Sequence, residues 1–146
     1  TELIMPSLFR HFLALMTVIA VLVPAHAAGD PPARVGRLSL VDGNVTYYGS
    51  QQDAGGPALV NWPISSGAVV NTERGARAEV WIGSTAYRLG SDSQAEFATV
   101  DDRSVDLLLH GGTLAVTIRD RDQADDLAVM TPAGQVRFFG TGRYRL

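Results

Sequence analysis

Apolar and polar residues alternate along most of the chain from residue 35 onward. The clearest case is residues 76–82, where every second position is Ala, Val or Ile. Arg77, Glu79 and Trp81 occupy the positions between them. Because successive side chains of a strand point to opposite faces, this pattern predicts a half-buried strand with Trp81 on its polar side.

Turn signals separate the alternating runs. Gly43 lies in an Asp-Gly-Asn sequence, and Gly111 is followed by Gly112. Glycine accepts the positive φ angles that tight turns need, so we expect each of these turns to close a β-hairpin. The predicted hairpins join residues 37–41 to 45–48 and residues 105–109 to 114–118.

Shorter runs predict further strands, and no segment after residue 27 has a convincing helical pattern. These strands are expected at residues 69–70, 86–89, 95–100, 127–131, 135–139 and 143–146. Residues 49–58 have no apolar period and are expected to form a surface loop. The sequence therefore predicts an all-β domain of about ten short strands, arranged as a roll, a short solenoid or a sandwich.

Five short motifs recur in order along this β region, each with glycine or proline beside an alternating run. They are Trp62-Pro63-Ile64 with Gly67, residues 75–80, residues 111–116, Thr131-Pro132-x-Gly134-x-Val136, and Gly140-Thr141. Their order and spacing resemble the FecR-type domain, the periplasmic β module of regulators that signal from an outer-membrane receptor to a sigma factor. The resemblance covers residues 35–146. Two residues, Gly142 and Arg143, precede the aromatic Tyr144 where the family pattern has one.

The FecR resemblance implies a sensing or interaction role in the envelope of a Gram-negative bacterium, without catalysis. The family's regulators also carry a cytoplasmic segment that grips the sigma factor and one membrane span. This sequence contains neither, so the resemblance favours a secreted variant without the anti-sigma segment.

The first 27 residues have the pattern of a secretory signal peptide. Arg10 precedes an apolar run at residues 12–23, and Ala25-His26-Ala27 suits cleavage before Ala28. The alternative is a membrane anchor, but a helix of that length rises only about 18 Å, against about 30 Å of hydrocarbon. We therefore expect a periplasmic or secreted protein without a stable membrane span once the signal is cleaved.

The two ends of the sequence bear on its domain limits. Met5 opens a conventional leader and is the expected natural start. Residues 28–34 are expected to be a linker and residues 35–146 the β domain. Residues 143–146 alternate like a strand in progress, which favours a domain truncated at its C-terminus.

Composition removes several functional classes. The chain has no cysteine, and all 12 of its basic residues are arginine. Disulfides, thiolate nucleophiles, cysteine-ligated metals and lysine chemistry are therefore excluded. The formal net charge of −3 gives no reason to expect a nucleic-acid partner. We expect no cofactor and no enzymatic activity.

His110 is the single histidine left after the predicted cleavage site. A catalytic triad would depend on it, but no Gly-x-Ser-x-Gly turn supplies a serine, so we interpret it as an exposed turn residue. Acidic residues cluster at Asp101-Asp102 and at residues 120–126. Their spacing does not match a calcium loop, and solvated turns are the favoured interpretation over a metal site.

Aromatic residues suggest a binding surface. Trp81, Tyr47 and Tyr48 can form a platform for stacking sugar rings or peptide side chains, while Trp62 occupies the family's tryptophan position and is interpreted as core. Two functions follow. The first is a non-catalytic module that binds an envelope protein, by strand addition to a sheet edge among other modes. The alternative is a glycan- or polymer-binding accessory domain of a longer secreted protein.

Overall fold

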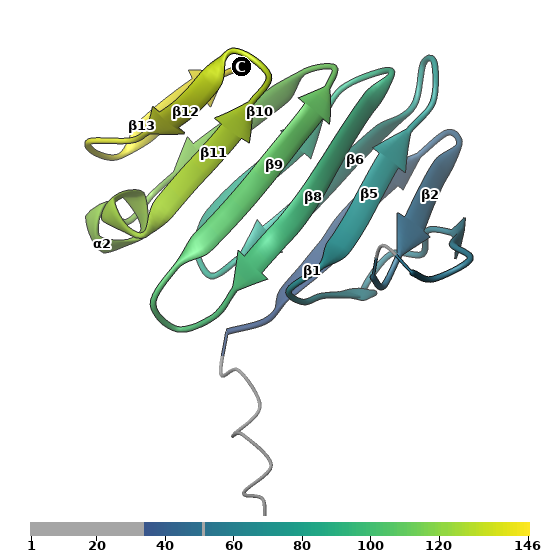
Figure 1. Cartoon of the computed structure of the whole chain (residues 1–146), viewed down its shortest axis with the longest axis horizontal. Coiled ribbons are helices and arrows are strands. Elements are labelled where there is room, and N and C mark those ends of the chain that lie inside the picture. Colours follow the sequence, from purple (N-terminus) through teal and green to yellow (C-terminus); the bar gives the residue numbers. More distant parts are fainter. Residues whose placement is uncertain (1–33, 51) are drawn as a thin grey trace, which may run out of the picture. The chain divides into compact units, whose positions relative to one another are not determined.

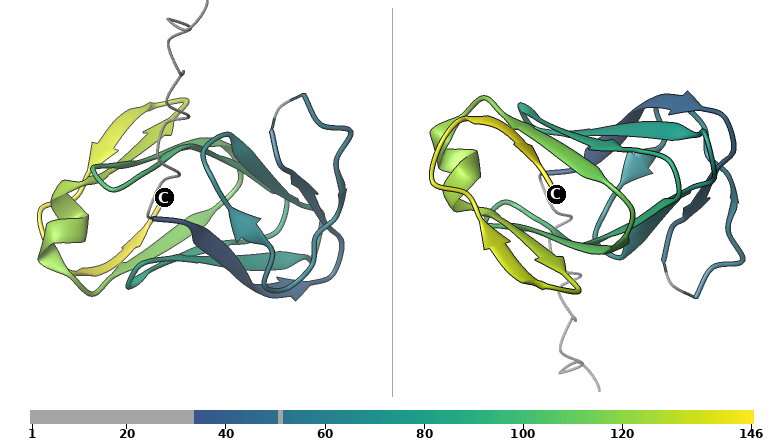
Figure 2. Two further views of the ribbon diagram at one scale, coloured as in Figure 1. Left: turned by 90° about the horizontal axis from the view of Figure 1, so that it is seen from below. Right: turned by 90° about the horizontal axis from the view of Figure 1, so that it is seen from above.

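The computed structural model describes residues 34–50 and 52–146. The predicted signal peptide, residues 1–27, and nearly all of the predicted linker lie outside these residues. The described residues belong to one compact unit made of two β-sheets that face each other (Figures 1 and 2). The all-β prediction is confirmed, and the arrangement is a sandwich.

Sheet A has six strands and is antiparallel throughout. In spatial order they are β13 (Gly142–Arg145), β10 (Leu114–Ile118), β7 (Thr85–Leu89), β6 (Arg77–Ile82), β1 (Gly36–Asp42) and β4 (Pro63–Ile64).

Sheet B has seven strands. In spatial order they are β12 (Gly134–Arg137), β11 (Leu127–Thr131), β9 (Val105–Gly111), β8 (Ser93–Val100), β5 (Ala68–Thr72), β2 (Val45–Tyr48) and β3 (Gly56–Pro57). The β9–β11 pair is parallel and the other pairs are antiparallel. A parallel pair needs a crossover, and here the chain passes through β10 of sheet A between the two strands.

The core lies between the sheets and follows the alternation in the sequence. Ala78, Val80 and Ile82 of β6 are buried, as predicted, because they face sheet B. At the centre, Tyr87 of sheet A meets Phe97 of sheet B edge to face, with 5.8 Å between ring centroids. Burial of alternate side chains from both layers is what a sandwich requires for stability.

Both predicted hairpins are wrong. β1 lies in sheet A and β2 in sheet B, and β9 and β10 are likewise in different sheets. The glycine turns are sharp corners that carry the chain from one layer to the other. At the second corner Gly112 has a φ of 90°, and a Cβ there would lie 2.4 Å from the Cα of Ser93. Each strand still buries its apolar face in the one shared core. The alternation in the sequence is therefore the same for a corner between two sheets as for a hairpin within one sheet.

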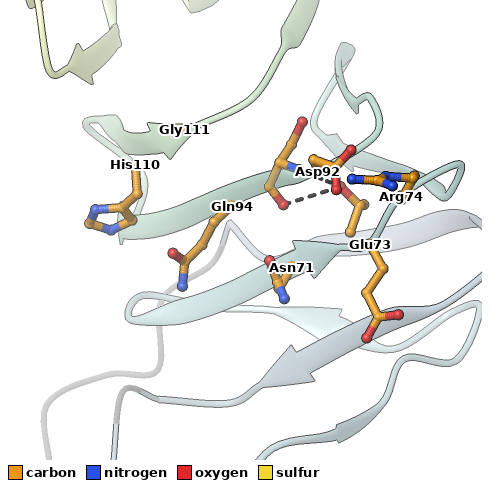
Figure 3. A pocket seen from close by; sticks show the side chains of 9 residues that line it. Asn71, Glu73, Arg74, Asp92, Gln94, His110 and Gly111 are labelled. Atoms are coloured by element: carbon orange, nitrogen blue, oxygen red, sulfur yellow. Dashed lines mark hydrogen bonds between the residues drawn. The ribbon is translucent and has the colours of Figure 1, made fainter.

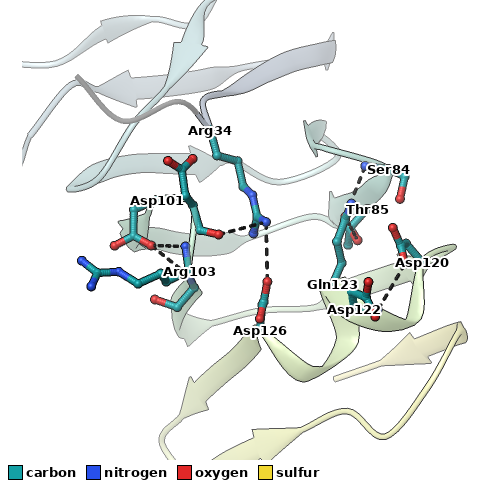
Figure 4. Close-up of polar contacts among 11 residues, drawn as sticks. Arg34, Ser84, Thr85, Asp101, Arg103, Asp120, Asp122, Gln123 and Asp126 are labelled. Atoms are coloured by element: carbon teal, nitrogen blue, oxygen red, sulfur yellow. Dashed lines mark hydrogen bonds and ion pairs between the residues drawn. The ribbon is translucent and has the colours of Figure 1, made fainter. Parts of the chain in front are cut away.

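A short helix, α2 (Arg121–Asp125), was not predicted and lies in the acidic run interpreted as a turn. The side chain of Asp120 caps it by accepting a hydrogen bond from the amide of Asp122. Gln123 accepts hydrogen bonds from the amide of Ser84 and the hydroxyl of Thr85 (Figure 4). Ala124 is buried, so this helix packs over the gap between the sheets that the chain crosses from β10 to β11.

The described residues form thirteen strands, against about ten predicted, because two-residue pairings such as β3 and β4 leave no alternation in a sequence. The strand expected at residues 135–139 ends at Arg137. Phe138 turns into the core and packs on Tyr144, with ring centroids 4.8 Å apart, while Phe139 is 88% exposed. Among the described residues, no helix has the length and apolar character needed to cross a membrane.

Candidate binding surfaces

The three aromatic residues predicted to form one platform lie in different places. Trp81 is on the outer face of sheet A and Tyr48 on the outer face of sheet B. The ring of Tyr47 packs edge to face on Trp62, 5.2 Å away, and its hydroxyl donates to the carbonyl oxygen of Pro63. Burial and the charge of Asp53 raise the pKa of Tyr47. The residues of the predicted platform are therefore not brought together.

The outer face of sheet A is rich in arginine. The cross-strand register places Arg145, Ala115, Arg88 and Glu79 in one row across four strands. A second row runs from Arg143 through Thr117, Ala86 and Trp81 to Arg37. With Arg119 beside Trp81, we define the arginine face by Arg37, Arg88, Arg119, Arg143 and Arg145. Arg77 of β6 points to the same side but forms an ion pair with Asp42 and is not counted among them.

Glu79 is the acid at the centre of this face. It forms an ion pair with Arg88 and accepts hydrogen bonds from the hydroxyl of Ser39 and from Nε1 of Trp81. Partial burial of Glu79 alone would raise its pKa. The two hydrogen bonds and the charge of Arg88 outweigh that effect and hold the pKa below its ordinary value. Glu79 is therefore ionised and held in place by its partners, and its charge neutralises Arg88, one of the five arginines.

Trp81 contacts one of the remaining arginines. The guanidinium carbon of Arg119 lies 4.8 Å from the centroid of the Trp81 ring. Ala86, which faces Trp81 across the β6–β7 pair, has a small side chain. The ring of the outward tryptophan therefore makes a cation–π contact with Arg119, which stabilises the position of both side chains.

The edge of sheet A beside this face is open. Leu114 and Leu146 exchange both backbone hydrogen bonds, which fixes the alternation along β10 and β13. By that alternation the N–H and C=O groups of Arg143 and Arg145 point away from β10. In the part of the chain that the structure describes, these groups have no backbone partner. Tyr144, whose hydroxyl donates to the carbonyl of Gly140, holds the strand in place.

The outer face of sheet B differs in kind. Its register forms a row of Tyr48, Val69, Glu96, Leu108 and Met130 across five strands. Val69 and Glu96 are nearly buried although they face outward, and Met130 is 45% exposed. This row is mostly apolar, with one carboxylate in its middle.

A shallow cleft lies next to Glu96 on the same face, with a volume of about 610 Å³. Asn71, Gln94 and His110 come from the neighbouring strands β5, β8 and β9 and line it (Figure 3). His110 belongs to a strand and not to the predicted turn, and its Nε2 lies 3.1 Å from Oε2 of Glu96. A second, smaller pocket adjoins the cleft and is lined by Tyr48, Val69 and Glu96, with Gln94 and His110 bordering both.

The acidic clusters act within the fold. The carboxylate of Asp101 accepts hydrogen bonds from the amides of Ser104 and Arg103, which lower its pKa. Arg34 donates to the carbonyl of Asp102 and pairs with Asp126 at 3.5 Å (Figure 4). No group of three or more histidine, aspartate or glutamate side chains in the described ranges is placed to hold a metal ion.

The sequence contained every arginine of the arginine face but no local signal that they meet. Arg37 and Arg145 are separated by more than a hundred positions, and only the strand order β13-β10-β7-β6-β1 brings them to one face. The cleft was missed for the same reason, because Asn71, Gln94 and His110 lie on three strands. The one signal in the sequence for either surface was the placement of its residues at outward positions of predicted strands.

Comparison with known proteins gave no match to a family model, a curated protein or a solved structure. The resemblance to the FecR-type domain therefore stays a prediction from the sequence motifs.

Proposed function

We propose that this chain is a non-catalytic, exported interaction module of the cell envelope, FecR-like in its motifs, that binds a partner protein by strand addition at β13. The observation that carries the proposal is the open edge at Arg143 and Arg145, where two exposed residues present backbone groups without a partner in the described residues. An extended peptide can satisfy such groups by becoming the next strand of the sheet.

β13 is a better candidate than the other sheet ends in the described residues. β3 and β4 are two-residue strands, too short to align a partner. β12 is as long as β13, but its outer face carries Gln135 and a single arginine, Arg137, whereas that of β13 carries two arginines. The half-buried Tyr144 and Leu146 on the inner side of β13 would pack against apolar residues of an added strand.

The experiment compares variants of Arg145 in the full chain, with an alternating Thr-Val peptide as the probe. Arg145→Pro removes the outward N–H and no hydrogen bond to β10, a change that edge strands tolerate. Arg145→Ala removes the same side chain and keeps the N–H. We expect Arg145→Pro to weaken peptide binding about tenfold relative to Arg145→Ala, measured by titration calorimetry. Equal binding by the two variants would show that the β13 edge is not used.

A second candidate is binding of a neutral glycan at the cleft of sheet B. The observation that favours it is the grouping of Asn71, Gln94, Glu96 and His110 beside Tyr48, because planar polar side chains and an aromatic ring suit sugar hydroxyls and ring faces. Titration with cell-wall glycan fragments should shift the NMR signals of the His110 ring. Unchanged signals at saturating fragment concentrations would reject this site.

A further inference from the structure

We propose that the partner of the β13 edge is an extended acidic segment of a protein, with carboxylates at alternate positions and apolar residues between them. This inference rests on the proposed strand addition and specifies the chemistry of the added strand. It follows from what the two faces of sheet A present next to that edge.

Positive and negative charges are unevenly distributed over the surface of the chain. The arginine face carries five guanidinium groups, and Glu79 is the carboxylate that neutralises Arg88. The described chain nevertheless contains more acidic than basic residues. The positive charge is therefore concentrated on one face, where an acidic partner is attracted and a basic one is repelled.

The spacing of the two arginines on β13 matches that of side chains on an added strand. Arg143 and Arg145 lie two positions apart on β13 and point to the same face. Alternate side chains of an added strand repeat at about the same spacing of 6–7 Å, and side chains directly opposite have Cβ atoms about 5 Å apart. A partner with carboxylates at positions i and i+2 can therefore pair with both arginines at once.

The inward-facing residues of β13 determine which side chains suit the remaining positions of the added strand. Tyr144 alternates with the two arginines, and its ring packs on Phe138 at the margin of the core. Leu146 also packs against the core. A residue of the added strand next to Tyr144 would lose contact with water, which favours apolar side chains at i+1 and i+3. The recognised pattern is thus acidic, apolar, acidic, apolar.

The free backbone groups favour a polypeptide over another polyanion. A phosphate or sulfate polymer can contact the arginine face, but it has no regular donors and acceptors to pair with the N–H and C=O groups of Arg143 and Arg145. Arginine forms two parallel hydrogen bonds with a carboxylate, so five arginines without lysine suit carboxylate recognition.

The test uses the full chain and three nine-residue peptides that alternate Val with Glu, Thr or Lys. At low salt we expect the Glu-Val peptide to bind about tenfold tighter than the Thr-Val peptide, and the Lys-Val peptide to bind most weakly. The advantage of the Glu-Val peptide should shrink at high salt because exposed charges are screened. The variant R143E/R145E should reverse the order of the three peptides.

A charge-matched control distinguishes local pairing from net charge. Arg103→Glu combined with Arg121→Glu changes the total charge by the same amount at exposed positions off the arginine face. This control should keep the preference for Glu-Val. Loss of the preference in the control as well would overturn the inference, because net charge alone would then explain binding.

Two further outcomes separate this inference from the proposed function. Equal affinity for Glu-Val and Thr-Val, with the amides of Arg143 and Arg145 protected by both, would reject the acidic partner and keep strand addition. Tight binding of polyphosphate, without protection of those amides and in competition with Glu-Val, would show that the arginine face takes a polyanion and would overturn both.

Discussion

The outer faces of the two sheets are built from the same alternating pattern but expose different chemistry. Sheet A presents the arginine face around the anchored Glu79, whereas sheet B presents an apolar row with Glu96 paired to His110. The net charge of −3 is a sum that conceals this separation. The net charge of a sandwich therefore does not predict its binding partners when its two outer faces carry different charges.

The largest effect is expected from the core that both faces share. Phe97→Ala removes a fully buried ring that contacts Tyr87 across the two layers. We expect it to lower the free energy of unfolding by about 3–5 kcal/mol, measured by urea denaturation, and to impair both surfaces together. Phe139→Ala is the control, because Phe139 is 88% exposed and its loss should change stability by less than about 0.5 kcal/mol. A mild effect of Phe97→Ala would contradict the shared core.

A smaller effect is expected at the anchor of sheet A. Glu79→Ala leaves Ser39, Trp81 and Arg88 without their common acceptor and should cost about 1–3 kcal/mol of stability. Glu73→Ala is the matched control, because Glu73 is exposed and its carboxylate accepts a hydrogen bond from the side-chain amide of Asn44. An equally large loss of stability in Glu73→Ala would show that the contacts of the Glu79 carboxylate do not contribute more than those of an exposed glutamate.

The depressed pKa of Glu79 adds a pH dependence to the same residue. Its pKa is lower in the folded chain than in the unfolded chain, so its contribution is present above the ordinary value of 4.5. That contribution is lost as the pH falls below 4.5 through the folded pKa. Glu79→Gln should therefore show a smaller acid-induced loss of stability than the native chain, measured by thermal unfolding from pH 6 to pH 3. Parallel curves would contradict the assigned hydrogen bonds.

The smallest effect is expected where Arg119 covers Trp81. Arg119→Ala should reduce stability by about 0.5–1 kcal/mol and shift the tryptophan emission, since the cation no longer lies over the ring. Arg103→Ala, which removes an exposed arginine in another part of the chain, should leave the emission unchanged. An identical spectrum for Arg119→Ala would mean that the contact is not populated in solution.

The sequence was informative about strands and uninformative about which strands pair. Alternation at residues 76–82 identified β6 and its buried side, because that pattern is local. The turns at Gly43 and Gly112 were recognised, but a hairpin and a corner between layers need the same positive φ. The arginine face and the cleft depend on strand order, which is set by packing of the whole core. The helix at Arg121–Asp125 is one turn long and has only its Asp120 cap as a signal.

The two four-residue edge strands, β13 and β12, allow strand addition at β13 to be tested directly. Residue-resolved amide exchange of the full chain should be measured with and without the Glu-Val peptide. Strand addition at β13 predicts slower exchange at Arg143 and Arg145, with no change along Gly134–Arg137. Protection of β12 in place of β13, or of neither strand at saturating peptide, would contradict strand addition at the edge of the arginine face.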